Sequence, residues 1–410
     1  MTAAPDALRQ VLLALAAIVV TGHGLARLFA RFGQPPVIGE VVAGIVLGPS
    51  LIGAKASAWI LPPGVAPHLG TIAQLGVVLY MFMVGLELDM GALRGRRLTV
   101  GAIALAGIGA PFALGVGLAY AVHGRLAPPG VPLLSFALFI GVAMSVTAFP
   151  VLARILADRA LSDTALGRLA LAAAALGDVA AWCLLALVVG VATARPGDGM
   201  RVVAGAIAFI ALAALVARPI LRRWAARADA DFEAGAPPRG AVAALLAAVL
   251  VAAATTEAIG LHALFGAFLI GAVIPADSAV ARDVPRRLDP VVTGLLLPAF
   301  FAFTGMRTRI GLVHGAALWW TCAAVIAAAT IGKFGGTLAA ARLSGLGWRD
   351  GAVLGTLMNT RGLMELIVLN VGLELGILSP TLFAIMVLMA LATTMMTGPA
   401  LGRLLRPGSV

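Results

Sequence analysis

The sequence predicts an all-helical integral membrane protein, and three observations predict it. Of the 410 residues, 61% are hydrophobic and only 11% are charged, whereas charged residues make up about a quarter of a soluble domain. Apolar stretches long enough for a helix to cross the hydrocarbon core recur along the whole chain. Basic residues fall very unevenly between those stretches. The two cysteines lie inside apolar stretches and suggest neither a disulfide nor a metal site.

The apolar stretches number thirteen, which predicts thirteen transmembrane helices. Short connections join them, and the longest polar stretch, 222–239, is a linker rich in Arg, Asp, Ala and Pro. The segments cover approximately residues 8–30, 35–53, 67–90, 98–122, 132–157, 163–193, 201–221, 240–259, 261–281, 290–306, 311–341, 349–375 and 380–403.

The basic residues predict the orientation. In a soluble protein a net charge of +11 would suggest nucleic acid, but here basic loops account for it and no nucleic-acid partner is expected. With thirteen crossings, 20 of the 29 lysines and arginines fall on the face that holds the C-terminus, and seven on the other. The positive-inside rule then places the C-terminus in the cytoplasm and the N-terminus outside. Compactness and an Ala/Arg-rich composition suggest the bacterial inner (plasma) membrane.

Repeated glycine spacing suggests an internal duplication with inverted topology. The repeats are offset by seven segments, and an odd offset reverses orientation, which is typical of transporters; helix packing alone can also produce such glycines. The prediction is one membrane domain in two six-helix halves, 1–193 and 240–410, joined by a linking helix and cytoplasmic linker, 194–239, with no soluble regulatory domain. The matching glycines are Gly39 and Gly44 with Gly266 and Gly271, and Gly85 with Gly305.

Two segments at corresponding places in the proposed halves are predicted to be broken. In segment five, Ser145 and Thr147 precede Pro150, which removes a backbone donor and clashes with the preceding turn. In segment twelve, residues 359–362 combine two small polar residues, a charge and a glycine. Matching interrupted helices indicate a transport site, although either one alone would be a simple kink or polar patch.

Charged and polar side chains converge near the middle of the membrane. Asp178 lies in the apolar run 169–191, and a carboxylate at that depth is costly unless it binds or moves something. Asp178, Thr360 and Lys333 each lie 9–11 residues from a predicted cytoplasmic arginine, which is about 14–17 Å into a core of about 30 Å. Lys333 is therefore predicted to be the charge partner of Asp178.

Each of these residues is given a predicted role. The ion- and proton-binding set is Asp178, Thr147, Ser145, Thr360 and Asn359, with Asp178 and Thr147 as ligands of a monovalent metal cation. Arg361 and Glu365, spaced i, i+4, are predicted to neutralise each other. Together with Pro150 and Gly362 they are predicted to support the crossed, discontinuous helices.

The order and spacing of these motifs resemble the monovalent cation:proton antiporters, in the branch of glutathione-gated potassium efflux systems and plant and yeast cation/proton exchangers. The resemblance implies a non-enzymatic secondary transporter, usually a homodimer in the lipid bilayer, with a dimer scaffold and a mobile core of segments four to six and eleven to thirteen. It implies alternating access, with K⁺ or Na⁺ and protons competing for Asp178 and no cofactor beyond these ions. The matching stretches are 33–40, 47–50, 82–87, 145–152, 177–182, 260–268 and 359–366.

The chain departs from the family pattern in two places. Gly177 stands where many relatives carry Asn or Asp, which leaves the charge stoichiometry open. Many relatives carry a C-terminal regulatory domain, whereas this sequence stops at Val410, so regulation is expected from pH, short loops or a separate subunit. A passive cation channel and a non-transporting sensor remain alternatives. An intramembrane aspartyl protease is disfavoured, because position 175 is Ala and no second mid-membrane aspartate is present.

Overall fold

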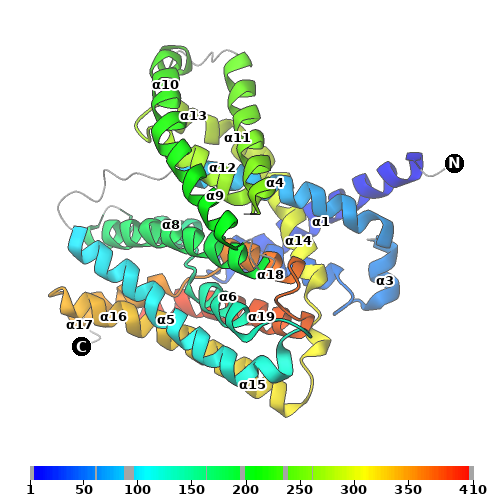
Figure 1. Ribbon diagram of the computed structural model, residues 1–410. Coiled ribbons are helices and arrows are strands. Elements are labelled where there is room, and N and C mark those ends of the chain that lie inside the picture. Colours follow the sequence, from blue (N-terminus) through cyan, green and yellow to red (C-terminus); the bar gives the residue numbers. More distant parts are fainter. Residues whose placement is uncertain are drawn as a thin grey trace. The chain divides into compact units, whose positions relative to one another are not determined.

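The computed structural model describes residues 4–60, 62–86, 97–162, 164–193, 199–233, 239–260 and 262–405, and its regular secondary structure there is helical (Figure 1). Glu87 and Leu261 of the predicted motifs fall outside the described residues, as do residues 194–198 and 234–238 of the predicted linker.

The helices follow one another with short connections. In chain order they are α1 (Ala4–Arg31), α2 (Pro36–Leu47), α3 (Gly53–Ile60), α4 (Ala66–Leu86), α5 (Arg97–Leu126), α6 (Leu133–Ser145), α7 (Phe149–Asp158), α8 (Ala165–Thr193), α9 (Gly199–Leu212), α10 (Arg218–Glu233), α11 (Arg239–Ile259), α12 (Ala263–Val273), α13 (Ala279–Val291), α14 (Leu297–Arg307), α15 (Gly315–Thr330), α16 (Gly336–Leu343), α17 (Trp348–Met358), α18 (Leu363–Glu374) and α19 (Pro380–Leu404). Short turns are 3-10 in η1 (Pro63–Val65) and η4 (Ile310–Leu312), and π-helical in η2 (Ala213–Ala217), η3 (Val292–Leu296) and η5 (Ile331–Gly335).

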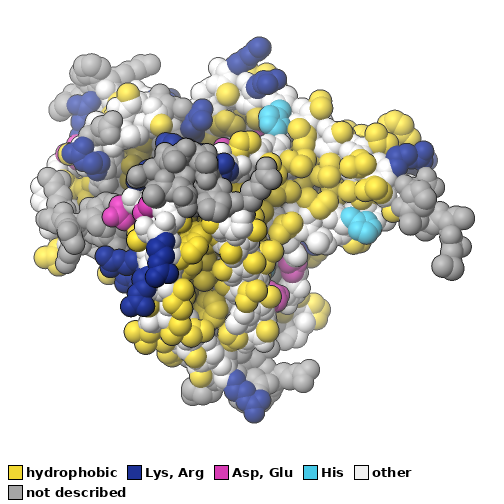
Figure 2. Space-filling view, turned by 90° about the horizontal axis from the view of Figure 1, so that it is seen from above, with side chains coloured by type: hydrophobic (Ala, Val, Ile, Leu, Met, Phe, Trp, Pro, Cys, Tyr) yellow, Lys and Arg dark blue, Asp and Glu magenta, His cyan; other side chains and the backbone are white. Residues whose placement is uncertain are grey.

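The helices have the length and composition of an integral membrane protein. Within the described ranges, nine helical spans are long and apolar enough to cross a membrane, or ten if the bent pair α17 and α18 counts as one. Hydrophobic side chains cover wide areas of the visible surface, and basic side chains form separate small groups (Figure 2). The remaining predicted segments contain the shorter apolar helices α2, α6 and α12, which at ~1.5 Å per residue cover only about 17–20 Å. Thirteen crossings therefore stay a prediction.

The chain forms two compact units. Unit 1 comprises Met1–Val11, Gly64–Met90 and Ala186–Phe300, and unit 2 comprises Leu12–Pro63, Gly91–Leu185 and Phe301–Val410. Unit 2 contains five of the six segments predicted as the mobile core and most of the sixth, whose residues 186–193 fall in unit 1. It also contains most of α1 and the whole of α2, which were predicted to belong to the scaffold. The core-and-scaffold grouping stays a prediction.

Glycines bring three helices of unit 2 into close backbone contact. A Cβ added at Gly44 of α2 would lie 2.6–2.9 Å from backbone atoms of Phe301 and Ala302, and one at Gly305 of α14 would lie 2.4 Å from Gly44. A Cβ at Gly39 would lie 2.5 Å from the α1 backbone. Because real Cβ atoms are essentially never that close, only glycine fits these positions.

Unit 1 contains the same arrangement at the matching glycines. A Cβ added at Gly271 of α12 would lie 2.2 Å from the carbonyl oxygen of Phe82 and 2.9 Å from Gly85 of α4. A Cβ at Gly266 would lie 2.3 Å from the carbonyl oxygen of Ala252 on α11. The glycines paired by the sequence pattern thus make equivalent helix contacts, each within its own unit.

A buried apolar cluster in unit 2 holds the helices that carry the predicted site. It joins residues of α5, α7, α8, α16, α17 and α19, with Ala148 of the α6–α7 connection. Ala173, Ala174 and Ala341 are fully buried in it. Small side chains on these helices allow the close packing on which the geometry of the polar site depends.

Candidate functional site: two broken helices in unit 2

The first predicted interruption is present. Helix α6 ends at Ser145, residues 146–148 are not helical, and α7 begins at Phe149. Pro150 occupies the first turn of α7, where its missing N–H is not needed for a helical hydrogen bond. The proline therefore favours a new helix start after the break, rather than a kink in one continuous helix.

The second predicted interruption is also present. Helices α17 and α18 are bent by 45° about residues 359–362. A Cβ added at Gly362 would lie 2.9 Å from Cγ2 of Val151 on α7, so a glycine lets the second break approach the first. The two breaks touch directly, because the backbone N–H of Ala148 donates to the Thr360 carbonyl at 3.0 Å. The Thr147 hydroxyl lies 3.4 Å from the Met358 carbonyl.

Asp178 is buried on α8. Its side chain is only 2% exposed, and within the part of the chain that the structure describes neither carboxylate oxygen has a hydrogen-bond partner. Ala174, one helical turn earlier, belongs to the same buried cluster as Ala148 and Met358, the residues that flank the two breaks. Residues one turn apart lie on the same side of a helix, so Asp178 lies on the side of α8 that packs against this cluster.

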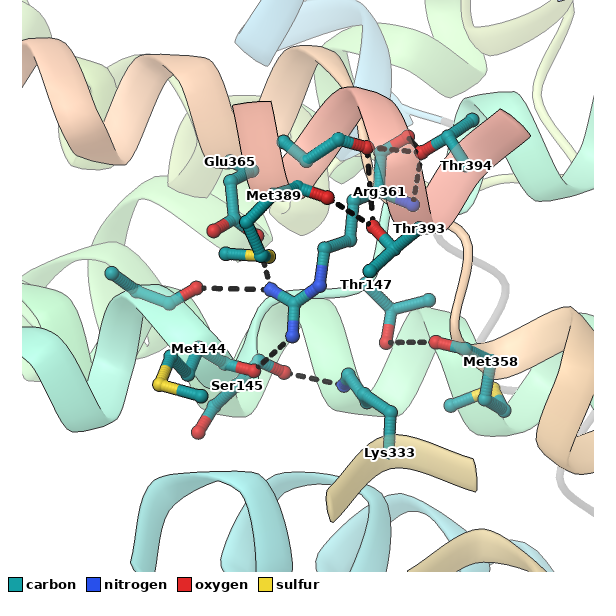
Figure 3. Close-up of polar contacts among 12 residues, drawn as sticks. Met144, Ser145, Thr147, Lys333, Met358, Arg361, Glu365, Met389, Thr393 and Thr394 are labelled. Carbon is teal, nitrogen blue, oxygen red and sulfur yellow. Dashed lines mark hydrogen bonds and ion pairs between the residues drawn. The ribbon is translucent and has the colours of Figure 1, made fainter. Parts of the chain in front are cut away.

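Arg361 connects the second break to the end of α6. Its side chain is fully buried, and it donates to the carbonyl oxygens of Ala143 at 3.2 Å and Met144 at 2.6 Å (Figure 3). It also forms an ion pair with the buried carboxylate of Glu365. The last carbonyls of a helix have no partner inside it and carry partial negative charge. Arg361 therefore caps α6 from the second break, besides pairing with Glu365 as predicted.

Lys333 caps the same helix end. Its ammonium group donates to the carbonyl oxygen of Ser145 at 2.5 Å (Figure 3) and to that of Gly107 at 2.8 Å. It lies in the π-helical turn η5, and Gly332 beside it packs so closely on Pro111 that a Cβ there would lie 2.7 Å from Cα of Pro111. Lys333 interacts electrostatically with Asp178, but no hydrogen bond joins these two described residues. The predicted charge partner is thus held by carbonyls in this conformation.

The predicted ion ligands differ in whether their side-chain oxygens already have hydrogen-bond partners. Thr360 Oγ1 and Asn359 Oδ1 are buried and, among the described residues, have no hydrogen-bond partner. The Ser145 hydroxyl instead lies 2.7 Å from the Gly141 carbonyl and 3.0 Å from the Ile108 carbonyl. Among the described oxygens of the predicted ion ligands, those without a hydrogen-bond partner therefore lie at the second break and on Asp178.

Thr394 on α19 supports the second break and was not among the predicted site residues. The Thr394 hydroxyl accepts from the backbone N–H of Arg361 at 2.9 Å and lies 2.6 Å from the Arg361 carbonyl. It thereby replaces hydrogen bonds that the broken helix loses. Three threonines within five residues of an apolar helix, Thr393, Thr394 and Thr397, are all buried, and this cluster was the signal available in the sequence.

The arrangement suits a small, hard cation or a proton. Uncharged hydroxyl and amide oxygens with a carboxylate are hard ligands, which do not favour soft transition metals. Among the described residues, no group of three or more His, Cys, Asp or Glu side chains could hold a metal ion. These oxygens have the chemistry to hold a proton or a hard cation beside the Asp178 carboxylate.

Comparisons with known proteins agree with this architecture. A protein-family model described as "Sodium/hydrogen exchanger, transmembrane" matches residues 13–406. The sodium proton antiporter MjNhaP1 from Methanocaldococcus jannaschii, solved at pH 8, has a similar fold with a TM-score of 0.67 over 96% of both chains, at 15% sequence identity.

Three curated relatives are similar over most of this chain. The Na(+)/H(+) antiporter NhaS4 from Synechocystis is 40% identical, over 95% of this chain and 96% of its own. Cation/H(+) antiporter 18 from Arabidopsis thaliana is 41% identical over 98% of this chain and 50% of its own. K(+)/H(+) antiporter 1 from Saccharomyces cerevisiae is 32% identical over 93% and 44%. The chain thus spans nearly the whole cyanobacterial relative and about half of the plant and yeast relatives.

Proposed function

Because the chain belongs to the sodium/hydrogen exchanger family, a family of cation/proton antiporters and not of enzymes, we propose that it exchanges sodium or potassium for protons across the membrane as a secondary active transporter. The names of its relatives include a sodium, a potassium and a general cation antiporter. Both ions therefore stay candidates.

One observation carries this proposal: a buried carboxylate without a hydrogen-bond donor. The oxygens of Asp178 have no partner among the described side chains and backbone groups, although the side chain is only 2% exposed. A permanent structural carboxylate in a membrane is normally paired. A proton or a cation on Asp178 would supply the missing partner, and because each would neutralise the same charge, the two would compete.

The proposed cation ligands, besides Asp178, are the oxygens of Thr147, Thr360, Asn359 and Ser145. Thr360 and Asn359 are the strongest candidates because their buried oxygens have no partner within the described chain. Ser145 is the weakest, because its hydroxyl already contacts two carbonyls. Lys333 would act as a fixed countercharge near Asp178, which favours the ionised carboxylate when no cation is bound.

Alternating access by two inverted repeats is the proposed transport mechanism. The matched glycine contacts support it: Gly44 meets Gly305 in unit 2 as Gly271 meets Gly85 in unit 1. Such equivalence is expected if the two halves arose from one duplicated fold. A homodimer in the plasma membrane, with the N-terminus outside and the C-terminus in the cytoplasm, belongs to the same proposal.

The test is proton flux in everted vesicles that hold an imposed pH gradient. Sodium, potassium, lithium and rubidium are added in turn to vesicles with the wild-type protein or Asp178→Asn. We expect one or more cations to collapse the gradient with the wild type, and none to do so with Asp178→Asn. The matched control is Asp350→Asn, which removes an exposed carboxylate at the start of α17 and should leave exchange intact.

The alternatives predict different results. A passive cation channel would collapse an imposed membrane potential without moving protons, and a sensor would respond to neither gradient. Proton exchange that persists in a folded Asp178→Asn protein would remove Asp178 from the mechanism. If the proposal is correct, lowering the pH should also raise the cation concentration that gives half-maximal exchange, because protons compete for the same carboxylate.

A further inference from the structure

A pocket of about 480 Å³ lies where α1, α7 and α19 end in unit 2. Neither Asp178 nor the residues of the two breaks, 146–148 and 359–362, line it. Its described lining contains two arginines and no acidic residue. The lining residues are Phe32, Gly33, Arg159, Gly398, Pro399, Gly402 and Arg403.

Arg159 is held in place against α19. Its guanidinium donates to the Gly398 carbonyl at 3.2 Å, which uses only one of the five N–H groups that arginine carries. A Cβ added at Gly398 or Gly402 would lie 3.9 Å from the guanidinium nitrogens. The glycines therefore leave room above α19 for the guanidinium and for a ligand beside it. A guanidinium positioned in this way can bind phosphate through two parallel hydrogen bonds.

Both arginines of the pocket lie at helix ends. Arg159 is the C-cap of α7 and Arg403 lies in the last turn of α19, on the face predicted to be cytoplasmic, which is where lipid headgroups are expected. We propose that this pocket binds the phosphate headgroup of an anionic phospholipid. Basic pockets between transmembrane helices on that side of a membrane are suited to such headgroups.

The surroundings favour a lipid over a free phosphate ion. Phe32 in the pocket wall is 75% exposed, and Met395 and Met396, one turn closer to the membrane interior on α19, are 40% and 41% exposed. These side chains provide an apolar surface on which an acyl chain can lie while the phosphate contacts the arginines. Inorganic phosphate would contact the arginines but would make no use of the apolar surface.

The test is a titration of the purified protein with phosphatidylglycerol, with bound lipid counted by native mass spectrometry. Arg159→Gln combined with Arg403→Gln should weaken the apparent affinity of one bound lipid roughly 25-fold, since each basic residue near a membrane surface contributes about fivefold. The control is Arg286→Gln combined with Arg287→Gln, which removes two exposed charges from α13 and should leave that lipid bound. Phosphatidylcholine and inorganic phosphate are titrated in parallel.

Gly402→Met is a second variant that keeps both arginines and fills the pocket. We expect it to displace the same lipid, whereas general electrostatic attraction would leave binding unchanged. Equal lipid binding by the wild type, the double variant and Gly402→Met would overturn the proposal. Competition by millimolar inorganic phosphate as strong as that by phosphatidylglycerol would also overturn it, because the site would then recognise a free anion.

Discussion

The two helix breaks in unit 2 differ in which groups contact their oxygen atoms. At the end of α6, the carbonyls of Ala143, Met144 and Ser145 all accept hydrogen bonds from buried cationic side chains of the protein. At the α17–α18 break, neutral groups contact the carbonyls instead: the Thr147 hydroxyl contacts Met358, the Ala148 N–H donates to Thr360, and the Thr394 hydroxyl contacts Arg361. Among the described residues, the side-chain oxygens Asn359 Oδ1 and Thr360 Oγ1 have no hydrogen-bond partner. The carbonyls of the first break are thus capped by charged groups, whereas under the proposed function the second break offers its two unpartnered side-chain oxygens to an ion.

This difference distinguishes polar groups that stabilise the fold from polar groups that are proposed to bind an ion. Both breaks free the same kind of backbone group, and a sequence pattern alone treats them as equivalent. Under the proposed function, the buried cations at the first break support it, while the second break and Asp178 bind and release the ion. The following substitutions challenge this division, from the largest expected effect to the smallest.

Arg361→Met should destabilise the protein most. It removes the donors to Ala143 and Met144 and leaves the Glu365 carboxylate buried without its partner, which typically costs about 3–5 kcal/mol. Thermal unfolding in detergent measures the loss. Glu365→Gln should cost less, because both caps on α6 remain. If Arg361→Met unfolded at the wild-type temperature, the first break would not depend on this cap.

Lys333→Met should destabilise the protein by a smaller amount, about 1.5–3 kcal/mol, the usual contribution of hydrogen bonds to a charged group. The carbonyls of Ser145 and Gly107 lose their buried donor. The control is Lys55→Met, which changes the other lysine, an exposed residue of α3. Equal unfolding temperatures for the two variants would show that Lys333 does not stabilise the end of α6.

Thr360→Val and Ser145→Ala should have opposite effects. Thr360 Oγ1 has no partner among the described groups, so its loss should leave stability unchanged or higher. It should also raise the half-maximal cation concentration about tenfold, equivalent to ~1.4 kcal/mol of binding. Ser145→Ala should cost about 1 kcal/mol of stability and raise the half-maximal cation concentration less than Thr360→Val does, because the Ser145 hydroxyl already contacts two carbonyls. Measured unfolding temperatures and exchange kinetics that reversed this pattern would reverse the roles assigned to the breaks.

Thr394→Val should affect stability alone, by about 1 kcal/mol, with no change in cation affinity. It removes the acceptor of the Arg361 backbone N–H without changing charge or shape at the site. Hydrogen exchange at the Arg361 amide should become faster than in the wild type. Thr393→Val provides the comparison, because that hydroxyl contacts only carbonyls of its own helix, Met389 and Ala390.

Local patterns in the sequence predicted the parts of the site that depend on neighbouring residues. Pro150 and residues 359–362 predicted both breaks, because proline and clustered polar residues disfavour a continuous helix locally. The spacing of Arg361 and Glu365 predicted their ion pair for the same reason.

These local patterns could not predict contacts between residues that are far apart in the sequence. Arg361 reaches carbonyls that lie more than 200 residues earlier in the chain, and any backbone carbonyl looks alike in a sequence. Lys333 was predicted to meet Asp178 because carboxylates are visible in a sequence, whereas the carbonyls that a broken helix exposes are not. A carboxylate and a set of carbonyl oxygens can each stabilise a buried ammonium group, so the partner of Lys333 depends on the fold.

The π-helical turn η5 shifts the helical register of the segment that contains it. A π turn accommodates one residue more than the α-helical pattern, and each residue rotates a helix by about 100°. Relative to a regular helix, the side chains before η5 therefore face a different direction from those after it. Pro111 and Gly332 hold this offset in place, and Lys333 lies within it. If η5 became a regular α-helix with no residue removed, one half of the segment would turn by about 100° away from its neighbours, whereas deletion of one residue there would allow the α-helix to form with both halves still facing them.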